Sequence, residues 1–376
     1  MNRTYPLLFA LVLLLTLASG ALAQNPQSIA AIAPAAAPTG AQDARAILAS
    51  LPEADTLIYI NPRRIINEVA PRVMSATDLE GMRKTFADMN QFAGVDPTKL
   101  DFIVMAVRFR KPTADLKFTP PEFMAVTSGD FNAESLMNLA RMASEGKLRE
   151  EKYGSRTLGL MTIDPIAKEA EKNPFLKSFA EVGVVALNAN AVAVGSPGYL
   201  RAAMDAADGN GRISMESLNS LLRDPNVLAS AAGSPMTSFA KSFGILGTET
   251  NPRPAKCESN LGNFYVALTM DAANFMLRGA MGADNPDTAT IMNNLLSGLL
   301  RQATSYVPDK SGQTVMNSFQ LTAKDNEVVL SADLPQQMVI DFIKAKTEPK
   351  KEDAATTSAA KPAAKKPVVR RKRRRP

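Results

Sequence analysis

The sequence TLIYINP at residues 56–62 decides the fold, because it joins a strand directly to a helix. Its β-branched, aromatic and aliphatic side chains predict a short strand over residues 56–60. Asn61 is a favourable helix N-cap, and Pro62 at the first helical position lacks only an amide that would have no partner there. We therefore expect a strand that leads into a helix, and the same unit recurs along the chain.

Strand pairs that lead into helices recur through residues 42–346, the only part of the chain with ordinary globular composition. Ser196-Pro197 and Asn285-Pro286 are expected to begin helices as Asn61-Pro62 does. The order strand–strand–helix predicts an α+β fold with an antiparallel sheet and argues against a doubly wound parallel fold. Further strands are expected at residues 102–109, 122–127, 148–163 (two short strands), 182–187, 191–194, 263–269, 274–281, 313–323 and 327–332.

A weak internal repeat predicts that the fold consists of two related modules. Leu48-Ala49-Ser50 corresponds to Leu228-Ala229-Ser230, and Ser196-Pro197 corresponds to Leu334-Pro335. Each module is expected to be an antiparallel sheet with helices packed on one face. The expected ranges are 42–212 for the first α+β module and 213–346 for the second.

The helix that begins at Asn285-Pro286 carries apolar residues on two adjacent strips. Ile291, Leu295 and Leu299 recur every four residues, and this spacing predicts that they form the buried face. Met292 and Leu296 lie on the neighbouring strip and are further candidates for burial.

Two stretches resemble an uncharacterised family of exported bacterial proteins. The first is Leu51-Pro52-Glu53-Ala54-Asp55-Thr56, which matches the LP-x-D-type opening strand of that family. The second is AVAVGSPGYLRAAMDAADG at residues 191–209, where a V-x-G-S strand runs into an R-A-A-x-D-A helix. The resemblance covers roughly residues 45–345 and implies a structural architecture without any known activity.

The N-terminus has the pattern of an export signal. Arg3 precedes an apolar run at Leu7–Leu17, and Ala21-Leu22-Ala23 forms an A-x-A cleavage site. We expect a signal peptide at residues 1–23, an Ala/Pro-rich leader at 24–41, and a periplasmic or extracellular protein. The run is shorter than the roughly 20 apolar residues that span a bilayer. N-terminal sequencing would distinguish a cleaved signal from one retained as an anchor.

Charge is divided sharply between the body and the C-terminal tail. Residues 24–360 carry 33 basic and 37 acidic side chains, whereas residues 361–376 carry nine basic ones and no acidic one. We expect residues 347–376 to form a disordered linker and tail, which either contacts an anionic envelope surface or only adds solubility. The tail has no aromatic residue, so sequence-specific nucleic-acid binding is not expected. The candidate polyanion contacts are Lys365, Lys366, Arg370, Arg371, Lys372, Arg373, Arg374 and Arg375.

Composition excludes the commonest chemistries of exported hydrolases. The chain has no histidine, and therefore neither an imidazole base, a Ser-His-Asp triad nor a His-ligated zinc site. Cys257 is the single cysteine and cannot close an internal disulfide. P-loop, GxGxxG and GxSxG patterns are also absent. We expect no catalytic residue, no metal site and no cofactor.

One degenerate pattern points to acyl transfer on peptidoglycan by serine and lysine. Its three parts are Ser144-Glu145-Gly146-Lys147, Ser217-Leu218-Asn219 and Lys310-Ser311-Gly312. Such a nucleophile should begin a helix, whereas Ser144 is expected to end one.

A second degenerate pattern, at residues 206–217, resembles a calcium-binding loop. It carries Asp208 and Asn210 but lacks the first carboxylate and the bidentate glutamate. The other interpretation is a linker in which Gly209 ends one helix and Ser214 caps the next.

The sequence therefore favours an exported, non-catalytic binding or scaffold protein of the envelope whose tail contacts anionic surfaces. The alternatives are the serine–lysine enzyme and a carrier of an apolar ligand, such as a lipid, held between sheet and helices.

Overall fold

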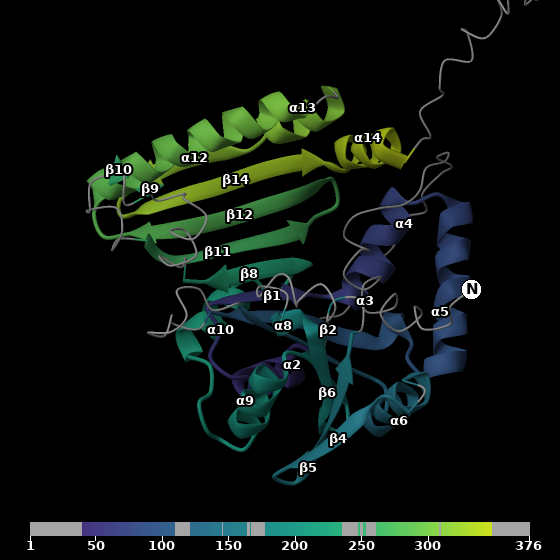
Figure 1. The fold of residues 1–376 in the computed structure, drawn as a ribbon. Helices are drawn as coiled ribbons and strands as arrows, with labels where there is room; N and C mark the ends of the chain where they lie inside the picture. The colour runs from purple at the N-terminus through teal and green to yellow at the C-terminus, as the bar shows by residue number, and fades with distance from the viewer. Residues whose placement is uncertain are drawn as a thin grey trace, which may run out of the picture.

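The computed structural model contains one large antiparallel sheet with helices packed against it (Figure 1). The prediction of an α+β fold with an antiparallel sheet is confirmed. Across the sheet the strands are β13 (Gln320–Lys324), β14 (Glu327–Pro335), β12 (Asn274–Ala283), β11 (Leu261–Met270), β8 (Ala229–Gly233), β1 (Thr56–Ile60), β2 (Leu100–Arg108), β3 (Glu122–Gly129), β7 (Ala191–Gly195), β6 (Glu181–Asn188), β5 (Arg156–Thr162) and β4 (Arg149–Tyr153). The described residues are 40–109, 121–144, 146–163, 166, 177–234, 247–248, 251–252, 261–307 and 310–347.

The remaining elements are a separate two-stranded sheet and the helices. The small sheet pairs β9 (Gly247–Thr248) with β10 (Asn251–Pro252). The helices are α2 (Gly40–Ala49), α3 (Pro62–Arg64), η1 (Ile65–Val69), α4 (Ala70–Val73), α5 (Ala76–Ala93), η2 (Pro97–Lys99), α6 (Ala133–Ala143), α8 (Lys177–Ala180), α9 (Pro197–Ala207), α10 (Met215–Leu221), α12 (Pro286–Tyr306), α13 (Lys310–Asn317) and α14 (Gln336–Thr347).

The two expected modules share a single sheet. β8 is hydrogen-bonded to β1 on one side and to β11 on the other, with Ala231 opposite both Ile58 and Val266. The sheet therefore runs across the module boundary predicted between Arg212 and Ile213. Two separate sheets were expected because pairing between distant strands leaves no local signal in a sequence.

Helices lie on both faces of this sheet, whereas the sequence predicted one. Adjacent strand residues point to opposite faces, and Ala267 and Leu268 of β11 belong to different apolar clusters. We call the Ala267 side the first face, which α2, α9 and α10 cover, and the Leu268 side the second face, which α4, α6, α12 and α14 cover. β2 and β7 are apolar at almost every position, so both of their faces need covering.

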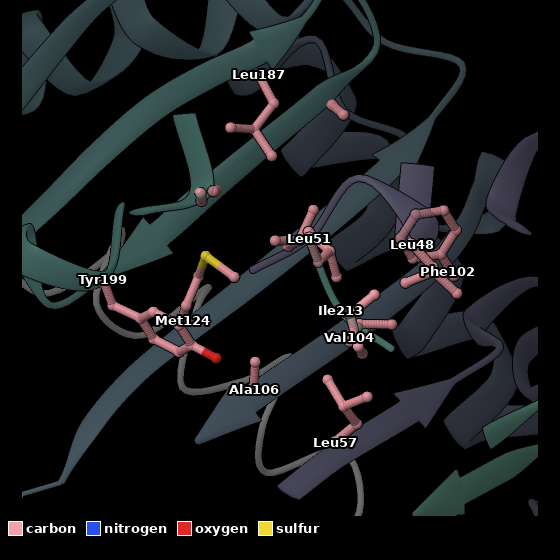
Figure 2. Packing of buried hydrophobic residues seen from close by; sticks show 14 of the residues in the cluster. Leu48, Leu51, Leu57, Phe102, Val104, Ala106, Met124, Leu187, Tyr199 and Ile213 are labelled. Carbon is pink, nitrogen blue, oxygen red and sulfur yellow. The ribbon is translucent and has the colours of Figure 1, made fainter. Parts of the chain in front are cut away.

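The largest core cluster lies on the first face (Figure 2). Leu57, Ala106 and Met124 are register neighbours in β1, β2 and β3, and all three are buried. Leu48 of α2 and Tyr199 of α9 belong to the same cluster and are almost completely buried. This packing fixes the two helices against the centre of the sheet.

The helix after β1 begins as predicted and then departs from regular geometry. The Asn61 side chain accepts a hydrogen bond from the Arg64 amide at 3.0 Å, which confirms the predicted cap. A kink was expected at Pro71, and the structure has the π-helical stretch η1 directly before it. There the Ala70 amide donates to the Ile65 carbonyl, five residues back. π-Bulges and proline residues are both recognised causes of kinks in helices.

Two other local predictions differ from the structure. Ser196 is the N-cap residue of α9, but its hydroxyl accepts from the Phe123 amide at 3.2 Å rather than from the helix. Residues 313–323 were predicted as one strand, whereas α13 extends to Asn317 and only β13 is extended. α13 packs on α12 and α14, and the Gln313 side chain donates to the Val307 carbonyl at 2.9 Å, so tertiary contacts override the strand pattern.

Candidate functional site

The predicted polyanion contacts lie outside the described residues. This holds for Lys365, Lys366, Arg370, Arg371, Lys372, Arg373, Arg374 and Arg375, and also for Cys257. The candidate sites therefore lie among the described residues of the folded body.

The three parts of the serine–lysine pattern lie on separate elements. Ser144 caps the C-terminal end of α6, as expected, and its hydroxyl donates to the Arg141 carbonyl at 2.8 Å. α6 packs on the second face against β6 and β7, whereas Ser217 lies in α10 on the first face. Lys310 begins α13, which packs on α12 near the opposite edge of the sheet. The structure does not bring these groups together.

The loop that resembles a calcium site is the predicted linker. Gly209 follows α9 with a φ of 107°, and the Ser214 hydroxyl caps α10 by accepting from the Ser217 amide at 3.2 Å. Asp208 pairs with Arg156 at 2.8 Å, so a carboxylate that calcium would need already has a cationic partner. Among the described residues, no group of three or more His, Cys, Asp or Glu side chains could hold a metal ion.

A polar pocket opens beside the first-face core at the ends of β1 and β2. Its volume is about 290 Å³, and the Asp55 carboxylate beside it accepts from the Phe109 amide at 2.7 Å. Arg108 donates to Glu122 through Nε at 3.0 Å and Nη2 at 2.6 Å. The lining residues are Glu53, Ala54, Asp55, Arg108, Phe109, Ile213, Ser214 and Ser217.

Arg108 also connects this pocket to the core. Its guanidinium carbon lies 4.5 Å from the centre of the Tyr199 ring, and the Tyr199 hydroxyl donates to the Glu53 carbonyl at 2.9 Å. Burial raises the pKa of the Tyr199 phenol, which therefore stays protonated as a hydrogen-bond donor. Sequence reasoning missed this cluster, although Arg108 and Glu122 lie at adjoining ends of two predicted strands. Since its polar groups are paired with one another, we interpret the cluster as structural.

The exposed face of α12 is the clearest departure from expectation. Ile291, Leu295 and Leu299 were predicted to be buried, yet their exposed fractions are 57%, 43% and 48%. The prediction was wrong because the neighbouring strip faces the sheet: Ala289 and Met292 are buried against Val328. Tyr306, at the end of the helix, is 76% exposed. We call Ile291, Leu295, Leu299 and Tyr306 the α12 stripe.

The helix itself is firmly placed. The Asn285 side chain accepts from the Thr288 amide at 2.8 Å, which confirms the predicted cap. A cavity of about 230 Å³ lies between α12 and α13, on the side away from the stripe, and is lined by Leu300, Arg301, Thr304, Met316, Asn317 and Phe319.

Within the ranges that the structure describes, no helix combines the length and apolarity needed to cross a bilayer.

Comparison with known proteins yields only a distant structural similarity. No known family and no curated protein matches the sequence. The chain is similar to crystal forms III and I of TP0453, with 11% identity and TM-scores of 0.42 and 0.41. Each match covers 79% of this chain, and 97% and 96% of the respective TP0453 chain.

Proposed function

We propose that this chain is an exported, non-catalytic binding or scaffold protein that attaches to an anionic surface of the cell envelope through its basic tail. The observation that carries the proposal is the division of charge. Nine cations lie in residues 361–376, whereas residues 24–360 have a net charge of −4. Because the body is mildly acidic, it is not attracted electrostatically to an anionic surface. The attraction therefore comes from the tail.

The strength of the attachment follows from the number of cations. Each lysine or arginine near an anionic lipid surface contributes about 1 kcal/mol, and the tail has nine. The contact is exposed to solvent, so it is screened beyond about 8 Å at physiological ionic strength. The proposal therefore requires binding that weakens steeply as salt rises.

Export would bring the tail into contact with the polyanions of the envelope. The n-region, apolar run and A-x-A site at residues 1–23 support secretion of a chain that begins at Gln24. Outside the cytoplasm, the available polyanions are lipid head groups, lipopolysaccharide, acidic polysaccharide and released nucleic acid. Recovery of a periplasmic protein that begins at Gln24 would support this localisation, and an intact precursor free in the cytosol would contradict it.

We also infer that the two halves of the body are related, with a binding surface built on their common sheet. From the central β1–β8 pair outward, one half has the order β1-β2-β3-β7-β6 and the other β8-β11-β12-β14-β13. In each half a hairpin leads into a helix, α6 or α12, on the second face. This order supports the predicted correspondence of Ser196-Pro197 with Leu334-Pro335, which precede α9 and α14, but α9 covers the first face and α14 the second. By contrast, residues 48–50 form the end of helix α2 and the turn after it, whereas residues 228–230 form the start of strand β8. This difference argues against that part of the match.

Sedimentation with lipid vesicles tests the attachment. Residues 24–376 are compared with residues 24–360 on vesicles of phosphatidylglycerol and phosphatidylethanolamine at 50 and 500 mM salt, conditions that bracket strong and weak screening. We expect salt-sensitive binding of the longer chain and strongly reduced binding of the shorter one. A matched control keeps the tail length and replaces its nine cations with glutamine, which should behave like the truncation. Equal, salt-insensitive partitioning of all three would overturn the proposal.

A further inference from the structure

The α12 stripe lies on one side of a well-packed helix, with the polar Gln302 between Leu299 and Tyr306. Ile291, Leu295 and Leu299 are spaced by four residues, and Tyr306 lies close to the same helical direction. The neighbouring strip of α12 is used by the core, since Ala289 and Met292 are buried against the sheet. The side chains of the stripe are therefore not needed to pack α12 against the sheet.

Its concentration on one helix distinguishes the stripe from ordinary surface residues. Single exposed apolar side chains are normal, but contiguous ones mark contact surfaces. Six large apolar side chains of the described residues are exposed, and four of them are the α12 stripe. The only charged residues of α12 are Asp287 and Arg301, so a partner that covers the stripe need desolvate few charges.

The size of the stripe favours a lipid surface over a second copy of the chain. Four side chains at these exposures offer apolar area on the order of 400 Å². A stable protein interface buries about 800 Å² on each partner, roughly twice as much. A bilayer interface needs no matching surface, and an amphipathic helix lies in it with its apolar side inward.

The tail can reach the surface that α12 would touch. α12, α13 and α14 follow one another along the same part of the molecule, and α13 packs against both of the others (Figure 1). α14 ends at Thr347, and the first tail cation, Lys361, follows 14 residues later. Those residues span at most about 50 Å when extended. An apolar contact and a basic segment together give stable attachment where either one alone is marginal.

We propose that the α12 stripe is a second membrane contact, which inserts into the interfacial layer of the anionic bilayer that the tail attracts. This inference rests on the proposed function and specifies its ligand as lipid. The tail supplies long-range, salt-sensitive attraction, and the stripe supplies short-range contact that salt does not screen. α12 then lies parallel to the membrane without spanning it.

A tryptophan reporter tests insertion directly, because the chain contains no tryptophan. Leu295→Trp places the single indole in the stripe, and Asn294→Trp places it on the exposed polar side of the same helix as a matched control. With phosphatidylglycerol–phosphatidylethanolamine vesicles, we expect a blue shift and quenching by brominated lipid for L295W and neither for N294W. Circular dichroism of both variants confirms that these surface changes leave the fold intact.

A second pair of variants measures the contribution to affinity. Leu295→Ser with Leu299→Ser should weaken vesicle binding at high salt about tenfold. Asn294→Ser with Thr290→Ser, both at exposed polar positions away from the stripe, should leave it unchanged. Loss of binding in residues 24–360 reports on the tail, whereas loss in the leucine variant reports on the stripe, so the two proposals fail separately.

Three results would overturn the inference. One is vesicle binding by L295W without a blue shift, which would leave the tail as the sole contact. Another is a blue shift that appears without vesicles and grows with protein concentration, which would assign the stripe to a second copy. The third is an absence of vesicle binding by the full chain at both salt concentrations.

Discussion

Gly233→Ala is expected to weaken the junction between the two halves of the sheet. Gly233 is the last residue of β8 and lies opposite Thr56 in β1 and Phe264 in β11. An added Cβ would lie 2.9 Å from the Thr56 Cα and closer still to the Asp55 carbonyl oxygen. Both obstacles are backbone atoms, so the two strands must separate because no side chain can rotate away.

The cost can be worked from these contacts. Overpacking at a site of this kind costs about 1–3 kcal/mol. Separation of the strands also strains the hydrogen bond from the Ser234 amide to the Asp55 carbonyl, 2.9 Å long, which contributes about 1 kcal/mol. Alanine lowers the entropy of the unfolded chain and returns about 0.4–1 kcal/mol. The net expectation is a loss of about 2 kcal/mol, or about 3 °C in melting temperature for a folded body of this size.

Thermal unfolding followed by far-ultraviolet circular dichroism is the assay, since the chain has no tryptophan. The matched control is Gly81→Ala in α5, where nothing lies within 4 Å of an added Cβ. Relief of the glycine penalty in a helix should raise stability there by up to about 1 kcal/mol. If Gly233→Ala melts at or above the temperature of the unmodified chain while the control behaves as expected, the close approach of β8 to β1 is wrong.

Three further predictions concern charge and ionisation. Glu122→Gln leaves the partly buried Arg108 without its carboxylate and should lower the free energy of unfolding in urea by about 2 kcal/mol. Glu181→Gln breaks an exposed pair with Arg149 and should lower it by less than about 0.5 kcal/mol, so equal losses would contradict the prediction. Burial, and the nearby carboxylate of Asp101, raise the pKa of Tyr59 to about 12 from 10.0. Folding therefore favours the neutral phenol, and the stability that Tyr59 contributes is complete below pH 10 and lost between pH 10 and 12. The urea midpoint of the unmodified chain should fall over that range, and Tyr59→Phe should reduce the fall. An unchanged fall would refute the assignment. Calcium at millimolar concentration should leave the melting temperature unchanged, because Asp208 of the loop after α9 pairs with Arg156 and Asp205 of α9 accepts from the Tyr153 hydroxyl; a rise would restore the calcium interpretation.

Local elements were predictable because their signals lie within a few residues of one another. β1 has the predicted bounds of residues 56–60. The side chains of the predicted caps Asn61, Ser214 and Asn285 accept hydrogen bonds from backbone amides in the first turn of their helices. The end of α6 at Ser144 also follows from the adjacent sequence. Each of these helix ends depends on a side chain that contacts backbone three residues away.

The candidate site was predictable only in part. That α12 exists follows from its apolar spacing and its Asn-Pro start. Which strip it buries does not, since Ile291, Leu295 and Leu299 compete with Ala289, Met292 and Leu296 for the sheet. The rotation of a helix about its axis depends on what it packs against, here Val328 and its neighbours. The α12 stripe is visible only after that choice has been made.

The sequence by itself determined most strands of the large sheet, though not β8, and most of the capped helices. It also determined the antiparallel α+β class and the separation of a basic tail from an acidic body. Only the tertiary structure decided that β8 joins both halves into one sheet, that helices cover both faces, and that an apolar strip of α12 faces outward. The physical reason is range: propensity and capping act between neighbours, whereas strand partners and helix faces are chosen by contacts between residues far apart in the chain.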